Sequence, residues 1–186
     1  MDAKELYKLA AAQQGLFTRV QARRLGASAY LVRHKLSTGE WVVVLGDVLA
    51  VAGLPLTRRV RQAAALLDLP ATVLAGPSAA RLLGLDCPDH RIFVAGQTGR
   101  RAPAMVRVLR EPVPVSDVLR VDGLPVTGPA RTTVDCLRVL RDEQAVALLE
   151  AALRAGHVNI QELARRVQER AGRRGTPRLV ALLNGA

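Results

Sequence analysis

The chain has 186 residues, 49% of them apolar, which excludes a disordered polyelectrolyte and suffices for one ordinary domain or two small ones. The formal net charge of +11 favours nucleic acid or another polyanionic surface as a partner. Only 3% of the residues are aromatic, which argues against proteins that stack single-stranded bases on aromatic side chains.

Two short helices are predicted at the start of the chain. Apolar residues recur at helical spacing over residues 3–13. Thr18 and Gln21 form a T-x-x-Q capping box, in which each side chain satisfies a free amide of the first helical turn. The second helix is therefore expected over residues 19–25, and Gly26 ends it.

A third helix and a hairpin are predicted next. Ser28 is the N-cap candidate for a helix over residues 29–37. Two β-branched runs, WVVVL and VLAVA, flank the turn residues Gly46 and Asp47. The order of three helices and a hairpin is that of a winged helix-turn-helix, which we assign to residues 1–53.

Residues 54–186 predict a mixed α/β domain with a helical C-terminal third, so the expected fold class is α+β. The strand-like runs are PATVLAG, RIFVAG, MVRVLRE and GLPVT, with the basic loop GQTGRRAP after the second. Helices are expected over residues 57–68, 78–83, 129–140, 143–156 and 160–172, with a last short one from Thr176. Asp142 and Asn159 are the expected caps of the two long helices near the end.

Three stretches of the chain carry a family resemblance: GLFTRVQARRLGASAYLVRHKLSTGEWVVV, GPSAARLLGLD and GLPVTGPARTTVDCL. Together they resemble the AbiEi-type antitoxin and transcriptional regulator family of bacteria, and they span most of the chain. The resemblance implies an N-terminal winged helix that binds the promoter of its own operon. It also implies a C-terminal domain that opposes a nucleotidyltransferase-like toxin in a type IV toxin-antitoxin pair.

Two further expectations come from this resemblance. Many family members continue into a nuclease-like extension, which would begin about where this chain ends, at PRLVALLNGA. No Asp…Glu-x-Lys cluster precedes that point, so we expect no nuclease activity and no enzyme. The wings of the family commonly carry a basic or histidine residue near the tip. Here Asp47 makes the tip acidic, which predicts weak contact between the wing and DNA phosphates.

The helix-turn-helix supplies the candidate DNA site. Arg33 is the expected base reader, because its guanidinium fork can pair with guanine O6 and N7. The start of the second helix is expected to favour a phosphate. The complete predicted set is Thr18, Arg19, Arg23, Arg24, Ser28, Ala29, Tyr30, Arg33, His34, Lys35 and Ser37. An ordinary solvated pair of basic helices is the alternative interpretation.

Other basic clusters are candidates for a second contact with DNA or with a protein partner. They comprise Arg58, Arg59, Arg61, Arg100, Arg101, Arg165, Arg166, Arg170, Arg173 and Arg174. A solvated surface is the alternative for each cluster. Arg131 and Asp135 lie four residues apart on one helix, and we expect a structural ion pair there rather than a toxin contact.

No cofactor or metal is expected. Cys87, Asp89 and His90 offer too few ligands for zinc and lack the paired spacing of its motifs. The histidines lie in no recognisable nucleophile motif, and the GQTGRR stretch lacks the spacing of a phosphate-binding loop. Without a signal peptide or a membrane span, a cytoplasmic location is expected.

Three functions fit these patterns. The first is a DNA-binding transcriptional regulator that acts as an antitoxin, with double-stranded DNA of its own promoter and a nucleotidyltransferase toxin as partners. The second is a protein-interaction module that antagonises an enzyme without specific DNA binding. The third is the non-catalytic DNA-targeting part of a nuclease-like protein. The sequence leaves both a monomer and a dimer open.

Overall fold

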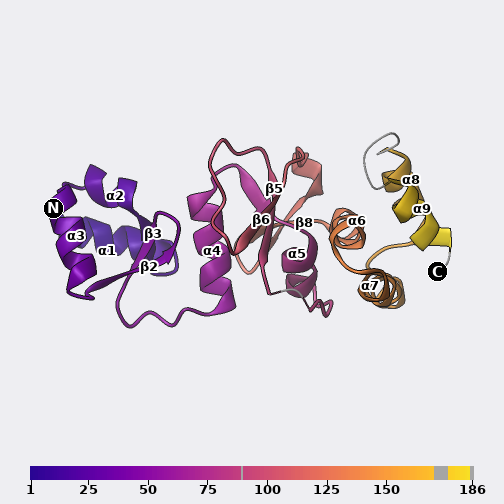
Figure 1. Ribbon diagram of the computed structural model, residues 1–186, viewed down its shortest axis with the longest axis horizontal. Coiled ribbons are helices and arrows are strands. Elements are labelled where there is room, and N and C mark those ends of the chain that lie inside the picture. The colour runs from indigo at the N-terminus through magenta and orange to yellow at the C-terminus, as the bar shows by residue number, and fades with distance from the viewer. Residues whose placement is uncertain (89, 170–175, 185–186) are drawn as a thin grey trace. The chain divides into compact units, whose positions relative to one another are not determined.

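The computed structural model describes residues 1–88, 90–169 and 176–184, and it shows an α+β chain with two sheets (Figure 1). The predicted roles of Asp89, Arg170, Arg173 and Arg174 therefore lie outside the described residues.

Contacts divide the chain into two compact units. The first comprises residues 1–72 together with 98–106, and the second comprises residues 73–97 and 107–186. The sequence predicts a boundary after residue 53 instead. The two divisions differ because the helix that follows the hairpin packs on all three strands of the first sheet, so contacts group it with the winged helix.

The first unit contains the three helices and the hairpin that the sequence predicts. Its elements are α1 (Ala3–Ala12), β1 (Leu16–Thr18), α2 (Arg19–Arg24), α3 (Ala29–Ser37), β2 (Trp41–Leu45), β3 (Val48–Val51) and α4 (Arg58–Asp68). The three strands form a sheet in the order β1-β3-β2. Strand β1 is not predicted from the sequence, because three residues are too few to show a periodicity. It forms by pairing antiparallel with β3.

Side-chain caps set the starts of α2 and α3. Thr18 Oγ1 accepts a hydrogen bond from the Gln21 amide at 3.1 Å, and Gln21 Oε1 accepts one from the Thr18 amide at 2.7 Å. This is the capping box that the sequence predicts. Ser28 Oγ accepts from the Leu31 amide at 3.1 Å, so α3 begins at Ala29 as expected.

The core of the first unit fixes the orientation of α3. Phe17 and Trp41 meet edge to face, with ring centroids 4.9 Å apart. Val32 of α3 is 4% exposed and packs in the same cluster, with Leu36 partly buried against it. Burying one face of the helix in this way leaves the opposite face in solvent.

The second unit is a five-stranded sheet with helices. Its elements are β4 (Thr72–Leu74), α5 (Gly76–Leu82), β5 (Ile92–Gly96), β6 (Val106–Leu109), the 3-10 turn η1 (Val115–Asp117), β7 (Val118–Val121), β8 (Leu124–Thr127), α6 (Pro129–Val139), α7 (Asp142–Arg154), α8 (Ile160–Gln168) and α9 (Thr176–Asn184). The strand order is β6-β5-β4-β8-β7, with β4 and β8 parallel and β7 and β8 antiparallel. Figure 1 shows the helical C-terminal third that the sequence predicts.

One predicted cap is wrong. The N-cap of α7 is Arg141, and Asp142 lies inside the first turn. The Asp142 carboxylate instead accepts hydrogen bonds from Nε and Nη2 of Arg178, at 2.8 and 2.6 Å. A guanidinium offers two charge-assisted bonds where an amide offers one neutral bond, so the carboxylate binds α9 rather than capping its own helix. Asn159 does cap α8, accepting from the Glu162 amide at 2.8 Å.

Candidate nucleic-acid interface

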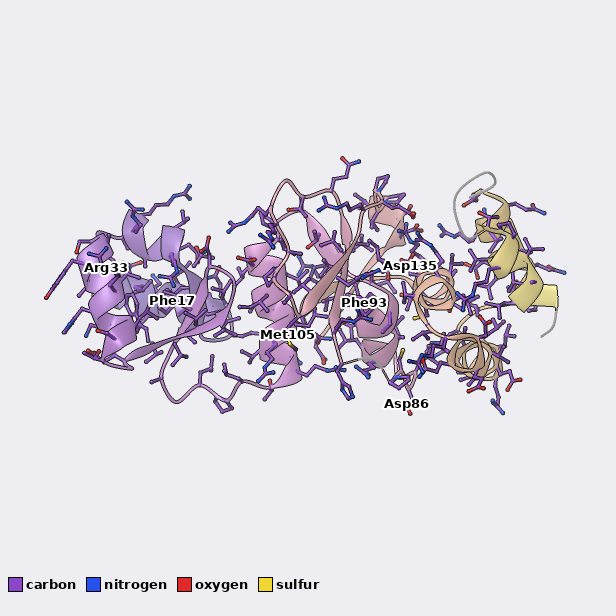
Figure 2. All side chains as sticks on the ribbon, viewed as in Figure 1. Phe17, Arg33, Asp86, Phe93, Met105 and Asp135 are labelled. Carbon is purple, nitrogen blue, oxygen red and sulfur yellow. The ribbon has the colours of Figure 1, made fainter. Side chains whose placement is uncertain are left out.

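The solvent face of α3 carries the side chains that the sequence assigns to base contact. Tyr30 is 70% exposed, and Arg33, His34 and Ser37 are exposed as well. The rings of Tyr30 and His34 stack one turn apart, with centroids 6.0 Å apart and planes within 4°. Figure 2 labels Arg33 on this helix and Phe17 in the core of the same unit. The helix thus offers a guanidinium and two aromatic rings to solvent, as a recognition helix must.

Further predicted contacts flank this face. Arg23 and Arg24 are exposed in the last turn of α2, and Ser28 and Ala29 are exposed where α3 begins. From residue 19 to residue 35 the helix pair carries no acidic side chain. The potential over this surface is therefore positive, as phosphate binding requires.

Lys35 is less available than its neighbours. Its side chain is 24% exposed, and its ammonium group forms an ion pair with Glu40, just beyond α3. The hydrogen bond from Lys35 lowers the pKa of the Glu40 carboxyl, which keeps that carboxyl charged. A phosphate contact by Lys35 must compete with this pair.

The start of α2 is also partly occupied. The Arg19 amide donates to the carbonyl of Asp47 at 3.0 Å, and the Gln21 amide donates to Thr18 Oγ1. The sequence predicts that this helix start favours a phosphate, but the predicted capping box and the hairpin turn already use two of its amides. The Arg19 side chain is also partly engaged, with its Nε 3.9 Å from Asp47 Oδ1.

The tip of the wing is held by a charge cluster that the sequence did not reveal. Asp47 Oδ2 accepts from Nη2 of Arg100 at 2.6 Å, and the Asp47 amide donates to Oδ1 of Asp68 at 2.9 Å. Asp68 ends α4 with a side chain only 3% exposed, and Arg100 Nη2 lies 3.5 Å from its Oδ1. We call Asp47, Asp68 and Arg100 the wing clamp. Its members lie up to 53 residues apart, so no local pattern signals it.

Gly46 is the residue that lets the clamp close. Its φ is +52°, and a Cβ there would lie 2.4–2.6 Å from the carboxylate atoms of Asp68. We expect Gly46→Ala to lower the free energy of unfolding by about 1–2 kcal/mol, because it combines a left-handed backbone with this collision. Denaturation followed by the fluorescence of Trp41 measures the change. Gly39→Ala also has a positive φ but meets open space, so a loss of equal size there would reject the collision.

The remaining basic candidates differ in their exposure to solvent and in their ion-pair partners. Arg58, Arg59, Arg61 and Arg101 are exposed, and Arg100 belongs to the wing clamp. Arg165 is 66% exposed, with Nη1 3.9 Å from Glu169. Arg166 instead donates to both carboxylate oxygens of the buried Asp117, at 2.8 and 2.6 Å. Its guanidinium is therefore engaged in the fold.

Arg131 and Asp135 form the ion pair that their spacing predicts, within a larger ring. Arg131 Nε lies 2.8 Å from Asp135 Oδ2, and Arg138 Nη1 lies 3.2 Å from Oδ1. Both arginines also reach Glu111, at 3.4 and 3.0 Å. Burial raises the pKa of the Asp135 carboxyl more strongly than the two arginines lower it. Asp135 has no exposed surface and the other three members are 10–21% exposed, which favours a structural role.

Within the described part of the chain, there is no metal centre, disulfide or membrane-spanning helix. No group of three or more His, Cys, Asp or Glu side chains there could hold a metal ion. Cys87 and Cys136 are free and buried, and burial raises the pKa of the Cys136 thiol. Among the described helices, none has the length and apolar character that crossing a bilayer demands.

Comparisons with known proteins agree with this architecture. The AbiEi antitoxin C-terminal domain family matches residues 71–185, which contain nearly all of the second unit. The crystal structure of the RV2827C protein from Mycobacterium tuberculosis is similar with a TM-score of 0.63, over 98% of this chain and 76% of that one. At 22% sequence identity this likeness concerns the fold alone. No curated protein sequence matches significantly.

Proposed function

The chain belongs to the AbiEi antitoxin family, and from that premise we propose that it is a DNA-binding antitoxin of a type IV toxin-antitoxin system. In this proposal it represses its own operon and counteracts a nucleotidyltransferase-like toxin. The family implies a cognate toxin as partner, and its match covers residues 71–185. The DNA-binding half of the proposal rests on the first unit.

The observation that carries DNA binding is the exposed, acid-free basic face of α2 and α3. An α-helix fits the major groove of B-DNA, and the side chains on its outer face meet the base edges. Arg33 and Tyr30 lie on that face, while Arg23 and Arg24 lie on the helix that crosses the backbone in this motif.

Arg33→Ala tests the base contact. We expect it to weaken binding to a duplex of the operon's own promoter by about 1–3 kcal/mol, because a bidentate pair with guanine is lost. A mobility-shift titration measures this, with a random-sequence duplex of equal length beside it. Lys8→Gln is the matched control, since Lys8 is 78% exposed on α1, outside the proposed face. Unchanged promoter affinity in Arg33→Ala would remove the assigned role.

Salt dependence separates DNA binding from the alternative of a protein-interaction module. A protein that neutralises about six phosphates loses affinity with a log–log salt slope near −5, at about 0.9 per phosphate. A slope near zero would favour the module.

Growth rescue tests the other half of the proposal. The full chain should relieve the toxicity of a neighbouring nucleotidyltransferase-like toxin, and Arg33→Ala should rescue equally well because its defect is confined to DNA binding.

A further inference from the structure

The loop that joins β5 to β6 contributes to the wing. Residues 98–106 cluster with the first compact unit, although the strands on either side belong to the second sheet. Arg100 in this loop reaches the hairpin turn and pairs with Asp47 at 2.6 Å. Thr98 Oγ1 accepts from the Arg100 amide at 3.2 Å, which shapes the loop locally.

The clamp changes the charge at the wing tip. Alone, the Asp47 carboxylate would repel a phosphate. It lies between two guanidinium groups, with Arg100 at 2.6 Å and Arg19 at 3.9 Å. Asp68 adds a second negative charge, but its carboxylate is 3% exposed and is bonded inward to the Asp47 amide. The Asp47 side chain is 44% exposed, but the two guanidinium groups beside it, 43% and 36% exposed, offset its charge toward an approaching anion.

Arg101 extends this positive surface. It is exposed and forms no ion pair with any residue that the structure describes. It follows Arg100 directly, so the clamp limits how far its backbone can move from the hairpin turn. Because the backbone beside the neutralised turn is already held, a phosphate contact by Arg101 has to order only its side chain.

The wing turn lies beside the helix that crosses the DNA backbone in this motif. The Asp47 carbonyl accepts from the amide of Arg19, the first residue of α2, at 3.0 Å. In helix-turn-helix proteins the helix before the recognition helix runs over the phosphates. Residues held against the turn are therefore close to the DNA phosphates over which that helix runs.

We propose that the β5–β6 loop completes the wing: Arg100 neutralises the acidic tip, and Arg101 binds a backbone phosphate of duplex DNA. The inference rests on the DNA-binding function proposed above. It supplies the basic wing residue that the hairpin sequence lacks, from a position more than fifty residues later in the chain.

Two exposed substitutions with opposite expected effects test the proposal. Arg101→Gln should weaken binding to the promoter duplex and to the random duplex by the same factor, about 3- to 10-fold. It should also make the salt slope shallower by about 0.9, the value for one phosphate. Asp47→Asn should strengthen binding to both duplexes, because it removes an exposed negative charge from the tip while the contact with Asp68 still holds Arg100 in place. Lys8→Gln, a charge loss on α1, should change neither quantity.

The outcomes separate this inference from the proposed function. If Arg101→Gln and Asp47→Asn both behave like Lys8→Gln while Arg33→Ala still loses promoter affinity, the composite wing is rejected and the DNA-binding function stands. If Arg101→Gln weakens only promoter binding, Arg101 reads bases and the phosphate assignment is wrong. If the unaltered chain binds neither duplex, both proposals fail. Thermal unfolding of each variant accompanies the titrations, because unchanged melting excludes an effect through folding.

Discussion

Asp135→Ala should lower the free energy of unfolding of the protein by about 3–5 kcal/mol, the cost of breaking a buried ion pair from one side. The carboxylate has no exposed surface and accepts from Arg131 at 2.8 Å and from Arg138 at 3.2 Å. Its removal leaves two guanidinium groups, 10% and 21% exposed, that share the Glu111 carboxylate among the residues the structure describes. Two largely buried cations that share one partner carry an uncompensated charge.

Circular dichroism during chemical denaturation measures this loss, because α5 to α9 supply much of the helix signal. The chain has one tryptophan, Trp41, whose fluorescence reports the first unit. Asp142→Ala is the control, since Asp142 also pairs with an arginine but its side chain is 77% exposed. An exposed pair is worth about 1 kcal/mol or less. Equal losses for the two variants would show that burial of the ring contributes nothing.

The ring illustrates how far spacing along one helix can predict a structure. Arg131 and Asp135 are four residues apart, and the pair they were expected to form is present. Glu111 lies 20 residues before Arg131 and joins the ring because the fold of the intervening chain brings it beside Arg131. No pattern at helical spacing carries that information, so the sequence predicted one ion pair where the fold brings four charged side chains together.

The winged helix shows the same limit at the candidate site. Thr18 and Ser28 cap their helices through amides three residues away, and such short-range signals predicted where α2 and α3 begin. Helical periodicity likewise placed Tyr30 and Arg33 on the solvent face, where the structure has them. Contact with DNA at these residues stays a prediction. Arg100 appeared in the sequence only as a cation in a glycine-containing loop, because its partner Asp47 is brought near by the tertiary fold.

Among the basic residues, sequence alone could not distinguish a solvated arginine from a structural one. Arg165 and Arg166 are adjacent on α8 and fall in one basic cluster of the sequence, for which a partner contact and a solvated surface were both open. A one-residue step turns a helical side chain by about 100°, so neighbours face different surroundings. Arg165 points to solvent, whereas Arg166 reaches Asp117, which is 49 residues away in the chain.

Arg166→Ala is therefore expected to cost about 3 kcal/mol of unfolding free energy, and Arg165→Ala less than about 0.5 kcal/mol. Arg166 donates two hydrogen bonds to Asp117, which raise the pKa of Arg166, and Asp117 is 5% exposed. Losing them leaves a buried carboxylate without its bidentate partner. Denaturation followed by circular dichroism compares the two variants, which remove the same charge from neighbouring positions.

If both keep full stability and lose DNA or toxin affinity alike, the two arginines form one solvated binding surface. Unequal stability loss instead assigns Arg166 to the fold and leaves Arg165 as the only one of the two available to a partner.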